Sequence, residues 1–148
     1  MSRLDGAATV CRMNASDEPI FRFPIRVYYE DTDLSGIVYH ANYLRYMERG
    51  RTEMLRANGI DQTGLAKMDR YLAIRSVSLS FKAPARIDDA LTVVTELVSS
   101  TGARGEIKQS VWREDTLLCE GEMTVVCIRA DGRPARIPPE ALALFPET

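Results

Sequence analysis

Apolar and polar residues alternate through much of the second half of the chain, which is the pattern of strands with one buried face. The alternation is strictest at residues 77–81, where Val77, Leu79 and Phe81 are separated by single serines. Three longer segments at hairpin spacing are also rich in β-branched and apolar residues: 91–98, 104–113 and 117–128. This half of the chain therefore predicts four consecutive strands.

One long helix is predicted before these strands, starting near residue 43. Apolar residues recur there at the spacing of one helix face, at Leu44, Met47, Met54 and Leu55. Gly50 falls on the same stripe, and a glycine inside a helix costs about 1 kcal/mol relative to alanine. We therefore expect a sheet to approach the helix closely at Gly50. Asn58 and Gly59 form a standard signal for the end of the helix.

The order of the elements predicts the fold class. A strand at 21–29 precedes the helix and four strands follow it, which is typical of an α+β domain with an antiparallel sheet. Residues 60–70 predict a short turn or half-helix, and Pro138 begins a short terminal helix. Residues 1–20 have no sustained period and are interpreted as a loose N-terminal extension, or alternatively as an element ordered on a partner subunit. Residues 21–148 are expected to form a single domain.

Composition and charge exclude several classes of protein. The chain has 148 residues and a net charge of −2, so nothing suggests a nucleic-acid partner. No apolar run approaches the ~20 residues of a membrane helix, and the first residues lack the apolar stretch of a signal peptide. The three cysteines lack metal-ligand or CxxC spacing, which favours a reduced, cytoplasmic setting. Cys119 and Cys127 share a strand face and are interpreted as buried small hydrophobic residues.

The candidate chemistry lies around the loop between the first strand and the helix. It consists of Tyr29, Asp31, Asp33, His40 and Glu48. A helix N-terminus presents free N–H groups and a partial positive charge, which suit a developing oxyanion. A carboxylate beside it can act as base or nucleophile. The alternatives are that Thr32 and Asp33 cap a turn and that His40, with no second histidine or nearby cysteine for a metal site, is structural.

Charged residues outside this loop allow two interpretations. Glu48 belongs to a charged helix face that is typical of solvated surface, but a helix wrapped by a sheet has little such surface. Glu48 is therefore also a candidate for facing a pocket. Lys82, Arg86 and Arg104 lie in predicted turns, where they are either phosphate contacts or ordinary surface charge. No glycine-rich phosphate loop, GxSxG elbow or Cys–His nucleophile pattern is present.

The same loop carries a specific resemblance to a known family. Residues 28–33 read YYEDTD and residues 36–43 read GIVYHANY. The likeness continues in FRFP at 21–24, ER at 48–49, RTEMLR at 51–56 and APARIDD at 83–89. Together these segments resemble the hotdog-fold acyl-CoA thioesterases of the 4-hydroxybenzoyl-CoA thioesterase type, and most of all their YbgC-like branch, which is associated with the Tol–Pal system. The resemblance covers about residues 21–145.

The resemblance implies a hotdog fold, in which a curved antiparallel sheet of five or six strands wraps around one long central helix. It also implies edge-to-edge homodimers, often paired into homotetramers, with active sites at the subunit interfaces. The implied substrate is acyl-CoA, or an acyl group carried on acyl carrier protein. Neither a cofactor nor a metal is implied.

Individual residues match the family's site. Asp33 matches the catalytic aspartate and is expected to be the general base or the nucleophile of thioester hydrolysis. His40 matches the histidine of the YbgC-like branch, where the hydroxybenzoyl branch has a tyrosine, and its backbone N–H is expected to polarise the thioester carbonyl. Tyr29 matches a residue lining the same site. Substrate contacts are expected from Gly36, Val38, Tyr39, Glu48 and Arg86.

Two other functions fit parts of the pattern. A hotdog hydratase or dehydratase also acts on acyl thioesters through an acid and a histidine, but those families resemble a different arrangement with a proline or asparagine loop, which this chain lacks. A non-catalytic module would hold acyl groups without cleaving them. The occurrence of Asp33 and His40 together argues against that module.

Overall fold

The structure is a computed structural model and describes residues 20–146. The helices and strands within this range follow one another as β1 (Ile20–Arg26), the one-turn 3-10 helix η1 (Tyr29–Asp31), α1 (Asn42–Ala57), α2 (Gln62–Lys67), β2 (Tyr71–Phe81), β3 (Ala90–Ser100), β4 (Arg104–Arg113), β5 (Thr116–Ile128), β6 (Pro134–Ala135) and α3 (Pro139–Leu142). Residues 1–20 were interpreted as an extension, and of these residues only Ile20 lies within the described range.

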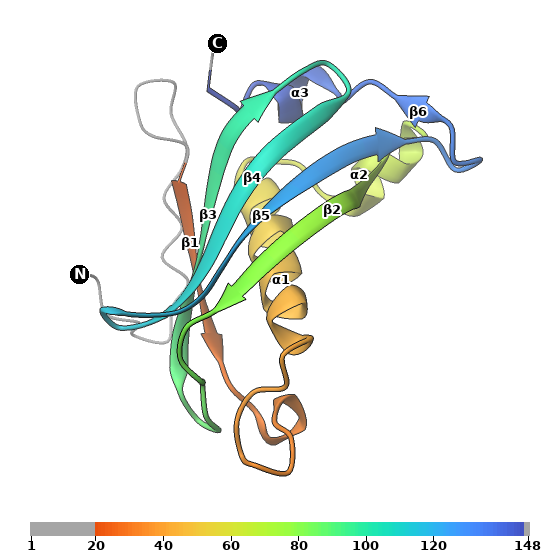
Figure 1. Cartoon of the computed structure of the whole chain (residues 1–148). Helices are drawn as coiled ribbons and strands as arrows, with labels where there is room; N and C mark the ends of the chain where they lie inside the picture. Colours follow the sequence, from red (N-terminus) through yellow and green to blue (C-terminus); the bar gives the residue numbers. More distant parts are fainter. Residues whose placement is uncertain (1–19, 147–148) are drawn as a thin grey trace.

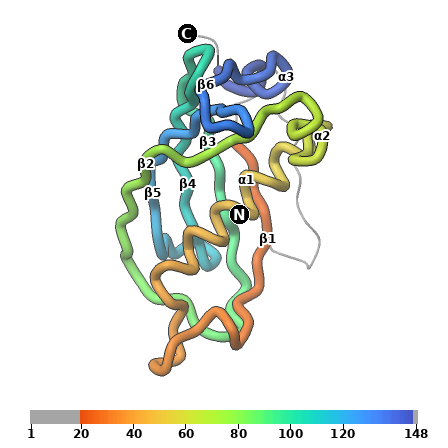
Figure 2. Tube along the Cα trace, turned by 90° about the vertical axis from the view of Figure 1, so that its right-hand side faces the viewer, coloured from red at the N-terminus to blue at the C-terminus, as the bar shows by residue number. Residues whose placement is uncertain are grey.

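The strands form one antiparallel sheet in the order β1-β3-β4-β5-β2, and β6 pairs with β5. The sheet curves, and α1 lies along its hollow side (Figures 1 and 2). β1 and β2 are the two edges of the main path of the sheet. The predicted α+β hotdog architecture is confirmed, with β6 as a short sixth strand.

The core lies between α1 and the hollow face of the sheet. Tyr46 and Met47 on α1 are fully buried, as is Val93 on β3. A Cβ built on Gly50 would lie 2.8 Å from Val93 Cγ1 and 3.4 Å from Gln109 Nε2, so the sheet leaves no space there for a side chain. The predicted close approach at Gly50 is confirmed, and it explains why α1 contains a glycine in its middle.

The strand boundaries are close to those predicted, with one correction at β1. β4 matches the predicted segment 104–113, and β3 and β5 extend the predicted segments by one or two residues. The first strand was expected to continue to residue 29, but it ends at Arg26. Asp31 accepts a hydrogen bond from the backbone N–H of Tyr28 at 2.8 Å, which fixes the one-turn helix η1 and takes the chain away from the sheet.

The strand predicted at 77–81 is also longer than expected, because β2 begins at Tyr71. A bulge interrupts its pairing with β5 between Ile74 and Ser76. Such an extra residue reverses the alternation of faces along a strand. The segment before the bulge is therefore out of phase with residues 77–81. For this reason strict alternation predicts only the second half of β2.

The smaller elements follow the predictions. α2 falls inside the predicted short element at 60–70, and Asp61 Oδ1 caps it by accepting a hydrogen bond from Gly64 N–H. α3 begins at Pro139, next to the proline expected to start it. Cys119 and Cys127 are both buried, which confirms their interpretation as core residues. Among residues 20–146, no helix has both the length and the apolar character needed to cross a membrane.

Candidate active site

The loop from β1 to α1 folds into a small irregular hairpin. Thr32 and Val38 pair as an antiparallel bridge, and Asp33 N–H donates to Ile37 O at 2.9 Å. The tip of the hairpin is a turn in which Gly36 N–H donates to Asp33 O at 3.0 Å. Gly36 has φ +79°, a left-handed conformation that glycine adopts without strain. This turn holds Asp33 at the end of the hairpin, beside the tip.

Asp31 anchors the hairpin to the helix. Its side chain is buried, and Oδ1 accepts a hydrogen bond from Asn42 Nδ2 at 2.8 Å while Oδ2 accepts from Tyr28 N–H. Asp31 O also accepts from Tyr39 N–H at 3.0 Å. Both carboxylate oxygens of Asp31 are thus occupied inside the protein, so this acid holds the loop and does not face solvent.

Asp33 has the opposite surroundings. Its side chain is exposed, and Oδ1 accepts one hydrogen bond, from Ser35 N–H at 2.8 Å. This hydrogen bond caps the turn, as the alternative interpretation of Asp33 as a structural residue expects. Among the described residues, Oδ2 has no hydrogen-bond partner, so a carboxylate oxygen remains free to meet a water molecule or a substrate.

His40 stands just before the start of α1. Its side chain is exposed, and its ring centroid lies 4.4 Å from that of Tyr39 and 6.3 Å from that of Phe81. No acceptor for the backbone N–H of His40 occurs in residues 20–146. Ala41, the N-cap of α1, provides no side-chain acceptor. The start of α1 therefore has an unoccupied N–H and the positive end of the helix dipole.

Most of the other expected site residues gather around this loop. Arg86 bridges to Ile37, which brings the segment after β2 against the hairpin. Val38 is buried and its N–H donates to Ala85 O at 2.8 Å, so it supports the loop through its backbone. Tyr39 is half exposed beside His40. Tyr29 is 83% exposed, and no hydrogen bond of its hydroxyl occurs among the described residues.

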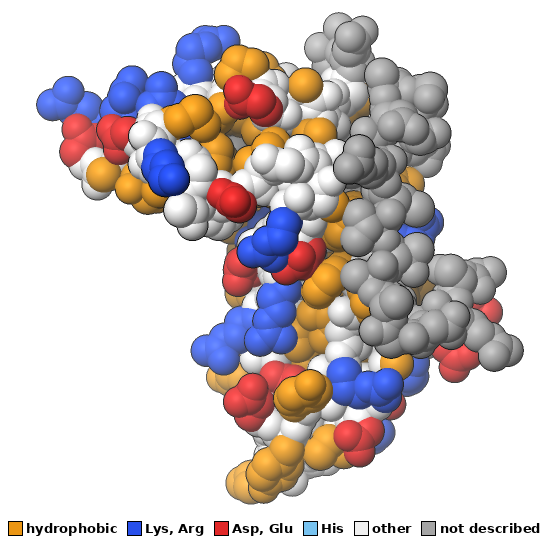
Figure 3. All heavy atoms as spheres, turned by 180° about the vertical axis from the view of Figure 1, so that it is seen from behind, with side chains coloured by type: hydrophobic (Ala, Val, Ile, Leu, Met, Phe, Trp, Pro, Cys, Tyr) orange, Lys and Arg blue, Asp and Glu red, His pale blue; other side chains and the backbone are white. Residues whose placement is uncertain are grey.

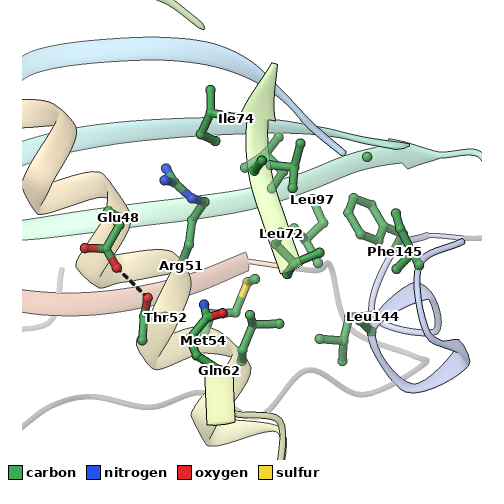
Figure 4. Close-up of a pocket in the computed structure, with 17 residues that line it drawn as sticks. Glu48, Arg51, Thr52, Met54, Gln62, Leu72, Ile74, Leu97, Leu144 and Phe145 are labelled. Carbon is green, nitrogen blue, oxygen red and sulfur yellow. Dashed lines mark hydrogen bonds between the residues drawn. The ribbon is translucent and has the colours of Figure 1, made fainter. Parts of the chain in front are cut away.

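Glu48 does not belong to this cluster. It lies further along α1, where its carboxylate accepts a hydrogen bond from Thr52 Oγ1 at 2.6 Å, and it lines a cavity between α1, β2 and α3 (Figure 4). Arg51 lines the same cavity, and its Nη1 donates to Gln109 Oε1 at 2.8 Å. Burial lowers the pKa of the Arg51 guanidinium from its ordinary value. Glu48 thus lines a cavity separate from the loop, and its expected contact with the substrate stays a prediction.

Phe81 is a neighbour of the site that the sequence did not single out. It ends β2, and its ring lies 5.6 Å from that of Tyr43 and edge-on to His40. The sequence indicated only that Phe81 is an inward-facing strand residue. Its place beside His40 depends on how β2 crosses the start of α1, which no local pattern encodes.

The charge around the molecule is mixed. On the face seen in Figure 3, Lys and Arg side chains are interspersed with Asp and Glu side chains over the described residues. Among residues 20–146, no group of three or more His, Cys, Asp or Glu side chains is arranged to hold a metal ion. The loop offers a free carboxylate oxygen on Asp33 and a free backbone N–H before α1, beside the exposed imidazole of His40.

Comparison with known proteins shows which family this chain resembles. The model of the thioesterase-like superfamily matches residues 27–145. The acyl-CoA thioester hydrolase YbgC of Escherichia coli is 43% identical over 124 residues, which cover 83% of this chain and 90% of that protein. The acyl-CoA thioesterase YbgC of Haemophilus influenzae is 38% identical over 127 residues, which cover 84% and 93%.

A solved structure supports the same assignment. The probable thioesterase from Bartonella henselae superposes with a TM-score of 0.78 at 36% identity, over 80% of this chain and 99% of that one. The match of the family model to most of the chain, the YbgC relatives and the common fold agree with one another. The chain therefore belongs to the thioesterase-like superfamily, as a hotdog-fold acyl-CoA thioesterase of the YbgC type.

Proposed function

We propose that this acyl-CoA thioesterase cleaves its substrate with Asp33 as the catalytic carboxylate and the start of α1 as the oxyanion site. The observation that carries the proposal is that one loop holds both groups in an available state. Asp33 is exposed with one free oxygen, and the backbone N–H of His40 has no acceptor among the described residues. Asp31, the other acid of the loop, is fully engaged in structure.

In this mechanism the thioester carbonyl oxygen accepts a hydrogen bond from His40 N–H. The dipole of α1 stabilises the negative charge that develops on that oxygen in the transition state. With Asp33 as base, the carboxylate takes a proton from water, the water oxygen bonds to the carbonyl carbon, and the C–S bond breaks to release CoA. With Asp33 as nucleophile, its oxygen bonds to the carbonyl carbon, the C–S bond breaks to release the CoA thiolate, and water then hydrolyses the resulting anhydride to the free acid and the Asp33 carboxylate.

Incorporation of ¹⁸O into Asp33 during a single turnover in ¹⁸O-labelled water identifies the nucleophilic route. A base delivers the labelled oxygen directly to the fatty acid and leaves Asp33 unlabelled. A nucleophile that is attacked by water at its own carboxyl carbon becomes labelled itself, and the first-turnover acid carries the original oxygen of Asp33. Mass spectrometry of the peptide that contains Asp33 reads out the result.

Four further residues of the cluster are assigned to substrate. Gly36 and Tyr39 border the thioester, Tyr29 lines the outer side of the site, and Arg86 contacts a phosphate of CoA. The position of Arg86 beside the hairpin supports this role. We assign Val38 to the loop that holds these contacts, because its side chain is buried.

We further propose a homodimer that forms through β2, with a homotetramer as the larger assembly. β2 is an 11-residue edge strand whose neighbour in the described sheet is β5 alone. Long exposed edges normally pair or are covered. Ile74, Val77 and Phe81 on β2 are 40–50% exposed, although they are large and apolar. Because Phe81 also contacts His40, a subunit added at β2 lies next to the site.

Light scattering on an active sample tests this assembly. We expect a mass of two or four chains of 16.6 kDa. An active monomer would show that the site is complete within one chain. A cytoplasmic location completes the proposal and is supported by Cys119 and Cys127, which are free thiols in this fold.

The function itself is tested by incubating the protein with purified acyl-CoA thioesters. Hydrolysis is measured as the release of free CoA thiol. We expect release from saturated acyl-CoA at a rate proportional to the protein concentration. A hydratase would instead add water to an enoyl-CoA and release no thiol, and a binding module would retain acyl-CoA unchanged. Acyl groups on acyl carrier protein form a second substrate panel in the same assay.

A further inference from the structure

Three hydrogen bonds form a closed frame around the peptide that carries the proposed oxyanion donor. Tyr39 N–H donates to Asp31 O at 3.0 Å, and Asn42 N–H donates to Tyr39 O at 2.8 Å. The side chain of Asn42 closes the frame, since its Nδ2 donates to Asp31 Oδ1 at 2.8 Å. Tyr39 is therefore held at both its N–H and its C=O, and Asn42 takes part in two of the three bonds.

The bond to Tyr39 O sets the direction of the His40 N–H. The C=O of Tyr39 and the N–H of His40 belong to one peptide, which is trans, and these two groups of a trans peptide point in opposite directions. Tyr39 O points at the backbone N–H of Asn42, in the first turn of α1. The N–H of His40 consequently points away from that turn, and it has no acceptor among residues 20–146.

The same frame also strengthens the donor. Hydrogen bonds in a chain polarise one another, so an amide whose C=O accepts a bond has a more positive N–H. The side chains of Asp31 and Asn42 are both buried, where such bonds are electrostatically stronger than in water. Tyr46 is fully buried one turn further along α1, and burial raises the pKa of its hydroxyl, with Asn42 and Asp31 among the other groups that act on it. The frame therefore lies in a part of the protein that excludes water.

We propose that Asn42 is a positioning residue for thioester hydrolysis, which orients and polarises the Tyr39–His40 peptide so that the His40 N–H meets the carbonyl oxygen of the substrate. The inference rests on the proposed function and adds a residue that does not itself touch the substrate. The Asn42 side chain fixes Asp31 relative to α1, and Asp31 O in turn fixes Tyr39 N–H. Without that side chain the frame is open, and the peptide can tilt.

Steady-state kinetics on butyryl-CoA compare Asn42→Ala with Asn58→Ala. Asn58 is the matched control, because its Nδ2 also donates one hydrogen bond, to Met54 O at 2.8 Å, at the other end of α1. Loss of an oxyanion donor costs about 10²–10³-fold in kcat, and a tilted donor should cost less, on the order of 10-fold to 100-fold. KM should change little, because the donor acts on charge that develops in the transition state. Asn58→Ala should keep its kcat.

A ketone analogue of butyryl-CoA reports on the donor without turnover. In this compound a CH₂ group replaces the thioester sulfur, so the carbonyl remains but cannot be hydrolysed. A hydrogen bond from the His40 N–H lowers the stretching frequency of the bound carbonyl, which isotope-edited infrared spectroscopy measures with a ¹³C label at that carbon. The shift should occur in the unmodified protein and in Asn58→Ala, and it should be largely lost in Asn42→Ala.

Further variants keep the test decisive if Asn42→Ala fails to fold. Asn42→Ser retains a residue that suits a helix start, but its shorter side chain cannot reach Asp31, so the carbonyl shift should again be lost. Asn42→Asp places a second carboxylate against Asp31. The double variant Asp31→Asn/Asn42→Asp exchanges donor and acceptor, and the amide introduced at position 31 can still accept from Tyr28 N–H. It should recover the shift and most of kcat.

The outcomes distinguish this inference from the proposed function. Absence of a carbonyl shift in the unmodified protein would overturn the oxyanion site, and the role of Asn42 with it. A shift that survives in folded Asn42→Ala or Asn42→Ser would overturn the role of Asn42 and leave the oxyanion site intact. Equal losses of kcat in Asn42→Ala and Asn58→Ala, or a folded double variant that does not recover the shift, would also overturn that role.

Discussion

The ring of Phe81 lies edge-on to the imidazole of His40, with 6.3 Å between the ring centroids and 84° between the ring planes. One residue ends the edge strand β2 and the other stands before α1. The same phenyl ring contacts Tyr43 at 5.6 Å. The free edge of the sheet and the start of the central helix are thus in direct contact at the proposed site.

Phe81→Ala should therefore lower kcat/KM by more than the loss of folded protein accounts for. Loss of an aromatic pair is worth about 0.5–1.5 kcal/mol, which predicts a drop of roughly threefold to tenfold in kcat/KM on butyryl-CoA. Tyr71→Ala is the matched control, since Tyr71 begins the same strand and is 40% exposed. Equal activity of the two folded variants would show that the contact with His40 does not matter.

Asp31 should prove to be a structural acid. Its buried carboxylate accepts hydrogen bonds from Tyr28 N–H and Asn42 Nδ2, and such charged hydrogen bonds are worth about 1.5–3 kcal/mol each. Asp31→Ala removes both bonds and should lower the free energy of unfolding in urea by about 3–6 kcal/mol. Asn42→Ala removes one of the same bonds and should lower it by less. A melting curve for Asp31→Ala that matches the unmodified protein would refute this assignment.

Gly50→Leu should destabilise the protein although leucine favours helices. The Cβ position is already 2.8 Å from Val93 Cγ1, so a larger side chain overpacks the core at a cost of about 1–3 kcal/mol. Arg45→Leu places the same side chain on the exposed face of α1 and should change the melting temperature little. A raised melting temperature for Gly50→Leu would mean that the sheet does not press on the helix there.

The two core cysteines should resist modification until the protein unfolds. Burial raises the pKa of the Cys119 thiol to about 11, and it also raises the pKa of Cys127. In a Cys11→Ser background, a thiol reagent at pH 8 should react with neither cysteine in the native protein and with both in urea. Rapid modification of the native protein would place at least one thiol at the surface.

The architecture was predictable because each element has a local signal. Regular alternation at residues 77–81 marks the second half of β2, and the stripe through Met47 and Met54 marks α1. The glycine at position 50 even predicted where the sheet presses on the helix. The errors came from long-range or irregular features. Residues 27–29 resemble a strand but turn away through the Asp31 cap, and the first half of β2 is hidden by its bulge.

The site was predictable in part. The motif from Asp33 to Tyr43 singled out the loop as the candidate site, and the structure distinguishes the two acids of that loop, a buried Asp31 and an exposed Asp33. Spacing could not separate them, because burial depends on which acid meets Asn42. The place of Phe81 and the cavity beside Glu48 arise from elements far apart in the chain, so no single stretch of sequence encodes them.

The most direct test of the catalytic role is kcat/KM of Asp33→Asn on its best acyl-CoA substrate. The asparagine side chain keeps the shape of the turn but neither takes a proton nor forms an anhydride. Asp131→Asn is the matched control, because Asp131 Oδ1 caps its turn in the same way, accepting from Arg133 N–H at 2.9 Å. With folding verified by circular dichroism, we predict a loss on the order of 10²–10⁴-fold for Asp33→Asn and little change for Asp131→Asn. Activity of folded Asp33→Asn within about threefold of the unmodified enzyme would contradict the account.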